Sequence, residues 1–214
     1  MSTATTTEKL YATDPEKWLN EIRDKNDFVG VVIFRGSWCK YDRYYLQKLG
    51  DYSKGKMADH NLHLIAWTSE GEEGAQKANE EWALTKDYGF DQVVGDETCA
   101  LSKYLLGDYL LEKLATSPFK DIRPSDKTKS PGTYPNGVVQ PGMIWYAHHT
   151  VVLEWEATVK APHFGATDRP DPKELFEEVL KRKHELDRGD AVLLVHGSRL
   201  KQCCTPMEVN CATM

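Results

Sequence analysis

The sequence predicts a single α/β domain in which a mixed β-sheet is flanked by helices on both faces. Short apolar segments rich in β-branched residues alternate with amphipathic helical segments through the first half of the chain. Two strands joined by a tight turn follow, and a last helix completes the pattern. With 214 residues and 40% hydrophobic content, the chain is long enough to bury one real core.

The first half predicts three strand–helix repeats after an initial helix. Asp14 caps that helix, which begins with Pro15 and runs to about Lys25. The later elements are a strand over 28–34, a helix over 40–49, a strand over 62–67, a helix over 73–87, a short strand around 93–94 and a helix from 98 to 106 or beyond.

The second half predicts a loop, a hairpin and a helix. Residues 116–137 contain four prolines and two glycines, which predicts a long loop without regular structure. Strands over 143–147 and 150–156 form a hairpin around two histidines, and the acidic residues Glu154 and Glu156 alternate with apolar ones, which predicts one solvent-exposed face. Asp171 and Pro172 begin the last helix. We expect a flexible segment over 1–13, one domain over 14–188 and a C-terminal extension over 189–214.

The most informative segment is Arg35-Gly36-Ser37-Trp38-Cys39, which joins a buried strand to a helix. A cysteine at that place lies among free backbone N–H groups at the positive end of the helix dipole, which favours the thiolate. We therefore expect Cys39 to be partly exposed and reactive. The alternative is that Cys39 packs as a small buried hydrophobic residue, as Cys99 is expected to do.

Several features resemble the peroxiredoxin-like branch of the thioredoxin superfamily, the alkyl hydroperoxide reductase/thiol-specific antioxidant group. They are the order of elements, the turn that ends at Cys39, Gln140-Pro141-Gly142 ahead of an apolar strand and Gly95-Asp96 before a helix. The resemblance covers about residues 14–186. It implies a thioredoxin-like fold and an antioxidant oxidoreductase whose nucleophile is Cys39. It implies no tightly bound cofactor, with glutathione or thioredoxin as the reductant, and a cis-proline at Pro141 that faces the cysteine and frees backbone groups for an extended substrate.

The sequence departs from two motifs of this superfamily. Peroxiredoxins carry Pro-x-x-x-Thr/Ser-x-x-Cys, whereas Val32 and Gly36 stand at the proline and hydroxyl positions. Thioredoxin-like proteins carry Trp-Cys-x-x-Cys, and here Asp42 stands in place of the second thiol. Asp42 either satisfies N–H groups at the helix start or acts as an acid or base toward Cys39 or a substrate. Arg43 either stabilises the thiolate, a role that Arg35 also suits, or is a solvated charge.

Beside Cys39, a substrate cleft is expected to be lined by Ser37, Trp38, Gln140 and Pro141. The favoured function is a thiol-dependent oxidoreductase of the single-cysteine peroxidase or disulfide reductase type. The alternative is a non-redox tailoring enzyme or binding protein that takes a small organic substrate in the same cleft. A third class is a binding module held on a membrane by its tail.

The C-terminus carries three of the five cysteines. The chain ends in Cys211-Ala212-Thr213-Met214, which fits the C-a-a-X pattern of a farnesylation acceptor, and Cys203-Cys204 would supply acylation sites for a second anchor. The alternative makes one of these three cysteines the resolving thiol for Cys39, in the same chain or across a homodimer. The apolar run over 191–195 is expected to dock on the domain or on a second subunit.

Charge and composition exclude several other classes. The net charge of −6 argues against a nucleic-acid partner, and no signal peptide or apolar run of the ~20 residues that a spanning helix needs is present. The uneven cysteine spacing predicts a reducing, cytoplasmic setting. The histidines lack cysteine or carboxylate partners at ligand spacing, so no metal site is expected.

Overall fold

The computed structural model describes residues 10–107, 116–117, 134–157, 169–190 and 195–196. Its strands form a six-stranded mixed sheet in the order β3-β2-β1-β6-β7-β8, and a separate two-stranded pair β4-β5. The strands are β1 (Phe28–Ile33), β2 (Leu62–Thr68), β3 (Gln92–Gly95), β4 (Thr116–Ser117), β5 (Val138–Val139), β6 (Gly142–Ala147), β7 (Thr150–Glu156) and β8 (Val195–His196).

The sheet is parallel on one side of β1 and antiparallel on the other. β1 and β2 run parallel, as do β2 and β3, which requires a crossover helix between each pair. β6 runs antiparallel to β1 from Phe28↔Ala147 to Ile33↔Gly142, and the tight turn after Ala147 leads into β7. The predicted mixed sheet is therefore confirmed.

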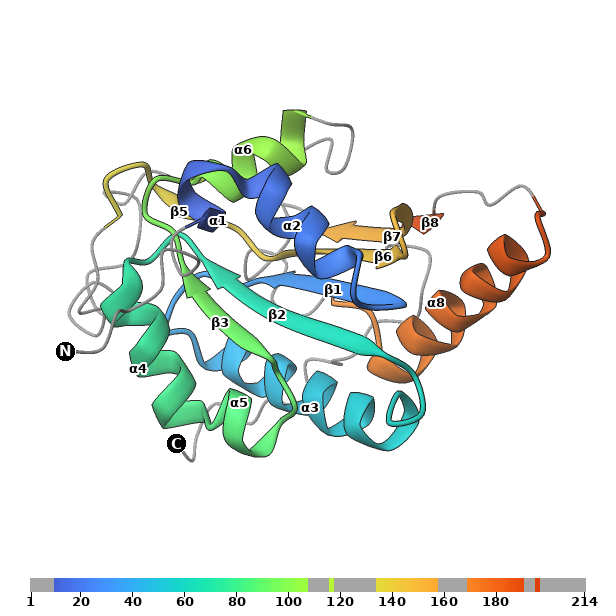
Figure 1. Ribbon diagram of the computed structural model, residues 1–214. Coiled ribbons are helices and arrows are strands. Elements are labelled where there is room, and N and C mark those ends of the chain that lie inside the picture. The colour runs from blue at the N-terminus through green and yellow to red at the C-terminus, as the bar shows by residue number, and fades with distance from the viewer. Residues whose placement is uncertain (1–9, 108–115, 118–133, 158–168, 191–194, 197–214) are drawn as a thin grey trace, which may run out of the picture.

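Helices cover both faces of this sheet (Figure 1). The described helices are α1 (Leu10–Thr13), α2 (Pro15–Arg23), α3 (Lys40–Lys56), α4 (Glu72–Trp82), α5 (Leu84–Asp87), α6 (Ala100–Gly107) and α8 (Pro172–Asp187). One core joins the sheet to α2 and α6 and includes Trp18, Leu19 and Leu105. The other joins it to α3, α4 and α8 and includes Leu49, Trp82 and Phe176. This arrangement confirms the predicted fold class.

The capping residues predicted at the starts of two helices, Asp14 and Asp171, are confirmed. Asp14 accepts a hydrogen bond from the backbone N–H of Lys17 at 3.1 Å, and Asp171 accepts one from Lys173 at 3.0 Å. Each cap is followed by a proline at the first helical position, where a missing N–H costs nothing.

The single helix predicted over 73–87 is wrong in one respect, because it divides at Ala83. Ala83 takes a left-handed conformation with φ of +55°, which ends α4. The side chain of Asn79 then accepts hydrogen bonds from the N–H and the hydroxyl of Thr85, both at 3.0 Å, and thereby supports the start of α5. Asparagine side chains can form hydrogen bonds with nearby backbone groups in place of the helical ones. A prediction from hydrophobic periodicity takes no account of these bonds.

The predicted solvent-exposed face of the 150–156 strand is also wrong, because Glu154 is buried. β7 does not lie at the edge of the sheet: β8 pairs with it in parallel, with Leu153 opposite Val195. Val195 ends the apolar run over 191–195, so docking on the domain is confirmed for that residue. The predicted loop over 116–137 is likewise corrected at its start, where β4 pairs with β5, and its residues 118–133 lie outside the described ranges.

Within the described residues, no helix is both long and apolar enough to cross a membrane.

Candidate active site

Cys39 lies at the N-cap of α3, a few residues beyond the carboxyl end of the central strand β1. Its backbone N–H donates to the carbonyl of Gly36 at 3.0 Å, which closes the turn between strand and helix. The residue is only 2% exposed. The expected partial exposure of Cys39 is therefore wrong, although its place at a helix start is confirmed.

Arg35 supplies the guanidinium that contacts the thiol. Its Nη2 donates to Sγ of Cys39 at 2.7 Å, and its Nε lies 3.4 Å from Oδ2 of Asp42. The backbone N–H of Arg35 donates to the same carboxylate oxygen at 3.0 Å. Arg35 is buried, so little solvent screens these contacts.

Burial raises the pKa of the Cys39 thiol to about 11. The positive charges of Arg35 and Arg169 act against this effect, whereas the negative charge of Asp42 adds to it. The helix-start position was expected to favour the thiolate, and this expectation is wrong for the described conformation. Desolvation of the charged form outweighs the charges, so Cys39 is a neutral thiol at neutral pH.

Asp42 forms a buried ion pair with Arg169, which lies three residues before the first residue of α8, Pro172. Nη2 of Arg169 donates to Oδ1 of Asp42, while Oδ2 accepts from Arg35. Burial alone would raise the pKa of Asp42, but Arg169 and Arg35 outweigh it and hold that pKa below its usual value. Asp42 is therefore a carboxylate with both oxygens bound to arginines.

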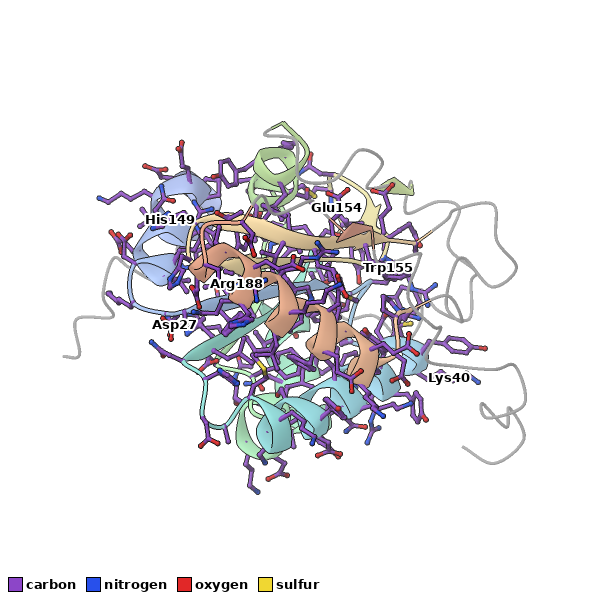
Figure 2. All side chains as sticks on the ribbon, turned by 90° about the vertical axis from the view of Figure 1, so that its right-hand side faces the viewer. Asp27, Lys40, His149, Glu154, Trp155 and Arg188 are labelled. Atoms are coloured by element: carbon purple, nitrogen blue, oxygen red, sulfur yellow. The ribbon has the colours of Figure 1, made fainter. Side chains whose placement is uncertain are left out.

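Arg43, the other candidate partner of the thiolate, is exposed on α3, and its backbone N–H donates to the carbonyl of Cys39 at 3.0 Å. The neighbouring Lys40, the first residue of α3, also lies on the outside of the molecule (Figure 2). Of the two arginines considered from the sequence, Arg35 is the one in contact with Cys39.

Ser37 is held by a buried glutamate that sequence reasoning missed. Its backbone N–H donates to Oε2 of Glu70 at 2.6 Å and its hydroxyl donates to Oε1 at 3.3 Å. Glu70 is fully buried. A signal was available, since β1 and β2 are parallel neighbours and the residues after their carboxyl ends must meet at one edge of the sheet. The hydroxyl of Ser37 was expected to line a substrate cleft, but it is hydrogen-bonded to Glu70 inside the protein.

Trp38 is half-buried and covers the outer side of Arg35. The Arg35 guanidinium carbon lies 5.5 Å from the centroid of the indole ring, a cation–π contact. The indole Nε1–H donates to the hydroxyl of Tyr134 at 2.9 Å, and that hydroxyl donates to the carbonyl of Arg35 at 3.0 Å. Tyr134 lies in the segment predicted as a loop and was not singled out from the sequence.

Gln140 and Pro141 are buried and lead into β6. The described part of the chain contains no cis peptide bond, so the cis-proline expected at Pro141 is wrong. The carbonyl of Pro141 accepts from the N–H of Ala157 at 2.9 Å. This hydrogen bond extends the β6–β7 pairing.

A narrow space lies on the inner side of the Asp42–Arg169 pair. It is lined by Tyr45, Pro141, Met143 and other side chains, and it does not admit a molecule the size of water. The hydroxyl of Tyr45 closes it toward α8 by donating to the carbonyl of Pro170 at 3.0 Å. In the described conformation the interior behind Asp42 is packed protein.

The other cysteines fall into two groups. Cys99 is buried in the core beside α2 and α6, as expected for a packing residue. Cys203, Cys204 and Cys211 lie outside the described residues. The hairpin tip with His149 lies far from Lys40, the first residue of α3 (Figure 2). In the described ranges no group of three or more metal-ligating side chains is placed to hold an ion.

Several solved structures have a fold similar to that of this chain. AhpC of Enterococcus faecalis superimposes with a TM-score of 0.51 at 6% sequence identity, over 78% of this chain and 81% of that one. A Cys-to-Ser variant of PrxQ from Xylella fastidiosa gives 0.44 at 10% identity, over 76% and 80%. A similar variant of peroxiredoxin 6 from Arenicola marina gives 0.42 at 15% identity, over 76% and 62%. No family model and no curated protein sequence matches the chain.

The chain thus has a thioredoxin-like fold similar to that of the peroxiredoxin AhpC, and this is the fold that the sequence resemblance implied. The AhpC match shows the fold alone, because 6% identity carries no information about the chemistry. What the site does must be argued from its own residues.

Proposed function

We propose that this protein is a thiol-dependent oxidoreductase in which Cys39 is the nucleophile. The observation that supports the proposal is the contact between Nη2 of Arg35 and Sγ of Cys39 at 2.7 Å, made at the N-terminus of α3. A guanidinium at that distance stabilises a thiolate and the anionic oxygen that leaves when the sulfur is oxidised. Cys39 is also the N-cap residue of α3, at the positive end of the helix dipole, and its side chain makes no capping hydrogen bond there.

With a hydroperoxide as substrate, the Cys39 thiolate attacks one peroxide oxygen. The S–O bond forms, the O–O bond breaks, and the alkoxide takes a proton to leave as an alcohol. The sulfur is oxidised to a sulfenic acid. One thiol of the reductant, glutathione or a thioredoxin-type dithiol, then forms a mixed disulfide with Cys39 and releases water. A second thiol releases Cys39 and leaves the reductant as a disulfide.

In this scheme Asp42 positions Arg35 and does not transfer a proton. Both its oxygens accept hydrogen bonds from arginines, and its pKa is held below the usual range. A carboxylate of this kind is a poor base at neutral pH. Arg169 in turn holds Asp42, so that α8 and α3 are fixed around the thiol.

The test is a peroxide-consumption assay with hydrogen peroxide and an alkyl hydroperoxide, with glutathione or thioredoxin as reductant. We expect Cys39→Ser to abolish turnover and Cys99→Ser, at a buried thiol in the other core, to retain it. Trapping with dimedone should label Cys39 in peroxide-treated protein. Equal turnover by wild type and Cys39→Ser would contradict the proposal.

The raised pKa of Cys39 and the carboxylate in place of a second thiol favour one alternative. In it the protein is a non-redox tailoring enzyme or binding protein that accepts a small organic substrate between Trp38 and Pro141. The same assays separate the two functions. The alternative requires that wild type consumes neither peroxides nor disulfides, and that dimedone does not label Cys39.

For the tail cysteines we propose a test that separates their two expected roles. Peptide mapping of oxidised protein under non-reducing conditions would detect a disulfide between Cys39 and Cys203, Cys204 or Cys211, the resolving role. Fractionation of cells that express wild type or Cys211→Ser would detect a lipid anchor as a membrane fraction that the variant loses. Wholly soluble behaviour of both proteins would exclude the anchor.

A further inference from the structure

Three side chains form a continuous stack from the solvent to the thiol, and a fourth side chain holds its outer end. Trp38 is half-buried, its indole lies over the guanidinium of Arg35, and that guanidinium contacts Sγ of Cys39. The hydroxyl of Tyr134 fastens the outer end of the stack, because it binds the indole N–H of Trp38 and the main-chain carbonyl of Arg35. We name these two hydrogen bonds the Tyr134 clamp.

The clamp depends on a glycine. Gly36 has a φ of +156°, and a Cβ at this position would lie 2.0 Å from the hydroxyl oxygen of Tyr134 and 2.7 Å from Nε1 of Trp38. The hydroxyl therefore occupies the space that any other side chain would fill. Glu70 also holds this turn by accepting a hydrogen bond from the N–H of Ser37, and its Oε2 lies 3.0 Å from the same Cβ position. The turn ahead of Cys39 is thus held by two groups from distant parts of the chain.

We propose that Tyr134 controls access to Cys39: the thiol reacts only when the two hydrogen bonds of the clamp open and Trp38 swings away from Arg35. The inference rests on the proposed function for its biological meaning, and it concerns the regulation of the same site. In the closed conformation Cys39 is 2% exposed, so neither a peroxide nor a partner thiol reaches the sulfur. Opening removes the outermost layer of the stack and leaves α3 and β1 in place.

Opening also changes the chemistry of the sulfur. Burial is the largest cause of the raised pKa of Cys39, and entry of water removes that cause. The contact with Arg35, which lowers the pKa, survives if the guanidinium stays on Asp42. The same motion therefore admits the substrate and favours the thiolate that attacks it.

The experiment measures the rate at which iodoacetamide alkylates Cys39 at pH 8, followed peptide by peptide by mass spectrometry in the full-length protein. Tyr134→Phe keeps the ring and removes both hydrogen bonds. We expect alkylation of Cys39 to become about tenfold faster, since the loss of hydrogen bonds of ordinary strength raises the open population by about that factor. Trp38→Phe removes one of the bonds and also leaves a smaller ring over Arg35, so it too should accelerate alkylation of Cys39.

Two controls make the result specific. Cys99, buried in the other core, reports global unfolding within the same sample. Tyr146→Phe alters a buried tyrosine near the start of β1, at the other end of the sheet from Cys39. An unchanged rate at Cys39 in Tyr134→Phe overturns the proposal. So does equal acceleration of Cys39 and Cys99, or the same acceleration in Tyr146→Phe.

The measurement needs neither peroxide nor reductant, so it is independent of the proposed function. A tenfold acceleration in a protein that shows no peroxidase or reductase turnover would support the clamp and reject the oxidoreductase. Turnover lost in Cys39→Ser together with an unchanged alkylation rate in Tyr134→Phe would support the oxidoreductase and reject the clamp.

Discussion

Asp42 and Arg169 are 127 residues apart in the sequence and form an ion pair in which 1% and 2% of the two side chains are exposed. The pair joins the first turn of α3 to the residues that lead into α8. The same carboxylate binds Arg35, so two guanidinium groups share one negative charge inside the protein. Such a cluster is stable only while all its members are present, because a buried charge without its partner is costly.

We therefore predict that Asp42→Asn lowers the free energy of unfolding by about 3 kcal/mol, the usual cost of breaking a buried ion pair from one side. It should also lower the pKa of Cys39, since the negative charge of Asp42 contributes to raising it. Urea unfolding and the pH dependence of alkylation measure the two effects. Asp51→Asn, at an exposed aspartate on the same helix, is the control and should change neither quantity.

Arg35→Gln should raise the pKa of Cys39 further and slow its alkylation at pH 8 by about tenfold or more, because one pKa unit is a factor of ten in thiolate. Arg43→Gln removes an exposed arginine from the same region and should have little effect. The alkylation rates of Cys39 in the two variants show which of the two arginines, Arg35 or Arg43, stabilises its thiolate. A larger effect of Arg43→Gln would show that the wrong arginine has been assigned to the thiol.

Stability should depend on pH through Cys39. The pKa of this thiol is raised from an ordinary value of 9.0 to about 11 in the folded protein, so between these values the folded state binds more protons than the unfolded state. The free energy of unfolding then falls as the pH rises from 9 to 11, by about 2 to 3 kcal/mol in total. Below pH 9 this contribution is fully present.

Denaturant unfolding of wild type and Cys39→Ser at several pH values between 8 and 11 measures this contribution as the difference between the two curves. The other groups that titrate in this range are common to both proteins and cancel. If the two proteins lose stability in parallel across the range, the thiol is not buried as the structure has it.

Gly30 and Gly55 differ in the space around them, so an alanine at each position should have the opposite effect on stability. A Cβ on Gly30 of β1 would lie 2.6 Å from Cζ3 of Trp145, a fully buried ring on β6. Gly30→Ala should therefore cost about 1 to 3 kcal/mol, the usual range for overpacking. On α3, Gly55 has open space around it, and Gly55→Ala should stabilise by about 0.5 to 1 kcal/mol. Thermal unfolding of both variants checks the opposite signs.

The order of strands and helices could be predicted from the sequence because it follows from local patterns. Hydrophobic periodicity located β1, β2 and α3, and Asp14 and Asp171 marked helix starts that the structure confirms. The helix break at Ala83 and the burial of Glu154 could not be found in this way. The first depends on a side chain that competes with the backbone, and the second on tertiary packing over the strand, which a pattern of alternating residues does not contain.

In the candidate site, too, some features follow from local sequence and others depend on the packing of distant segments. Cys39 and Arg35 belong to one short segment, and their proximity follows from the turn. Arg169 carries no periodic or motif signal and reaches Asp42 only through the packing of α8. The raised pKa of Cys39 could not be predicted from its place at the helix start, because it depends on the burial of the sulfur by the rest of the fold. Desolvation is a property of the assembled fold.

The close approach of Tyr134 to Gly36 limits which residues can occupy the two positions together. Position 36 is where the peroxiredoxin motif carries threonine or serine, and the Tyr134 hydroxyl lies 2.0 Å from the point at which such a side chain would begin. A β-carbon at 36 and a tyrosine hydroxyl from 134 therefore exclude each other. Sequences that share this turn and carry a side chain at 36 should therefore lack tyrosine at 134. An aligned set of relatives would record that exchange as covariation between two sites nearly a hundred residues apart.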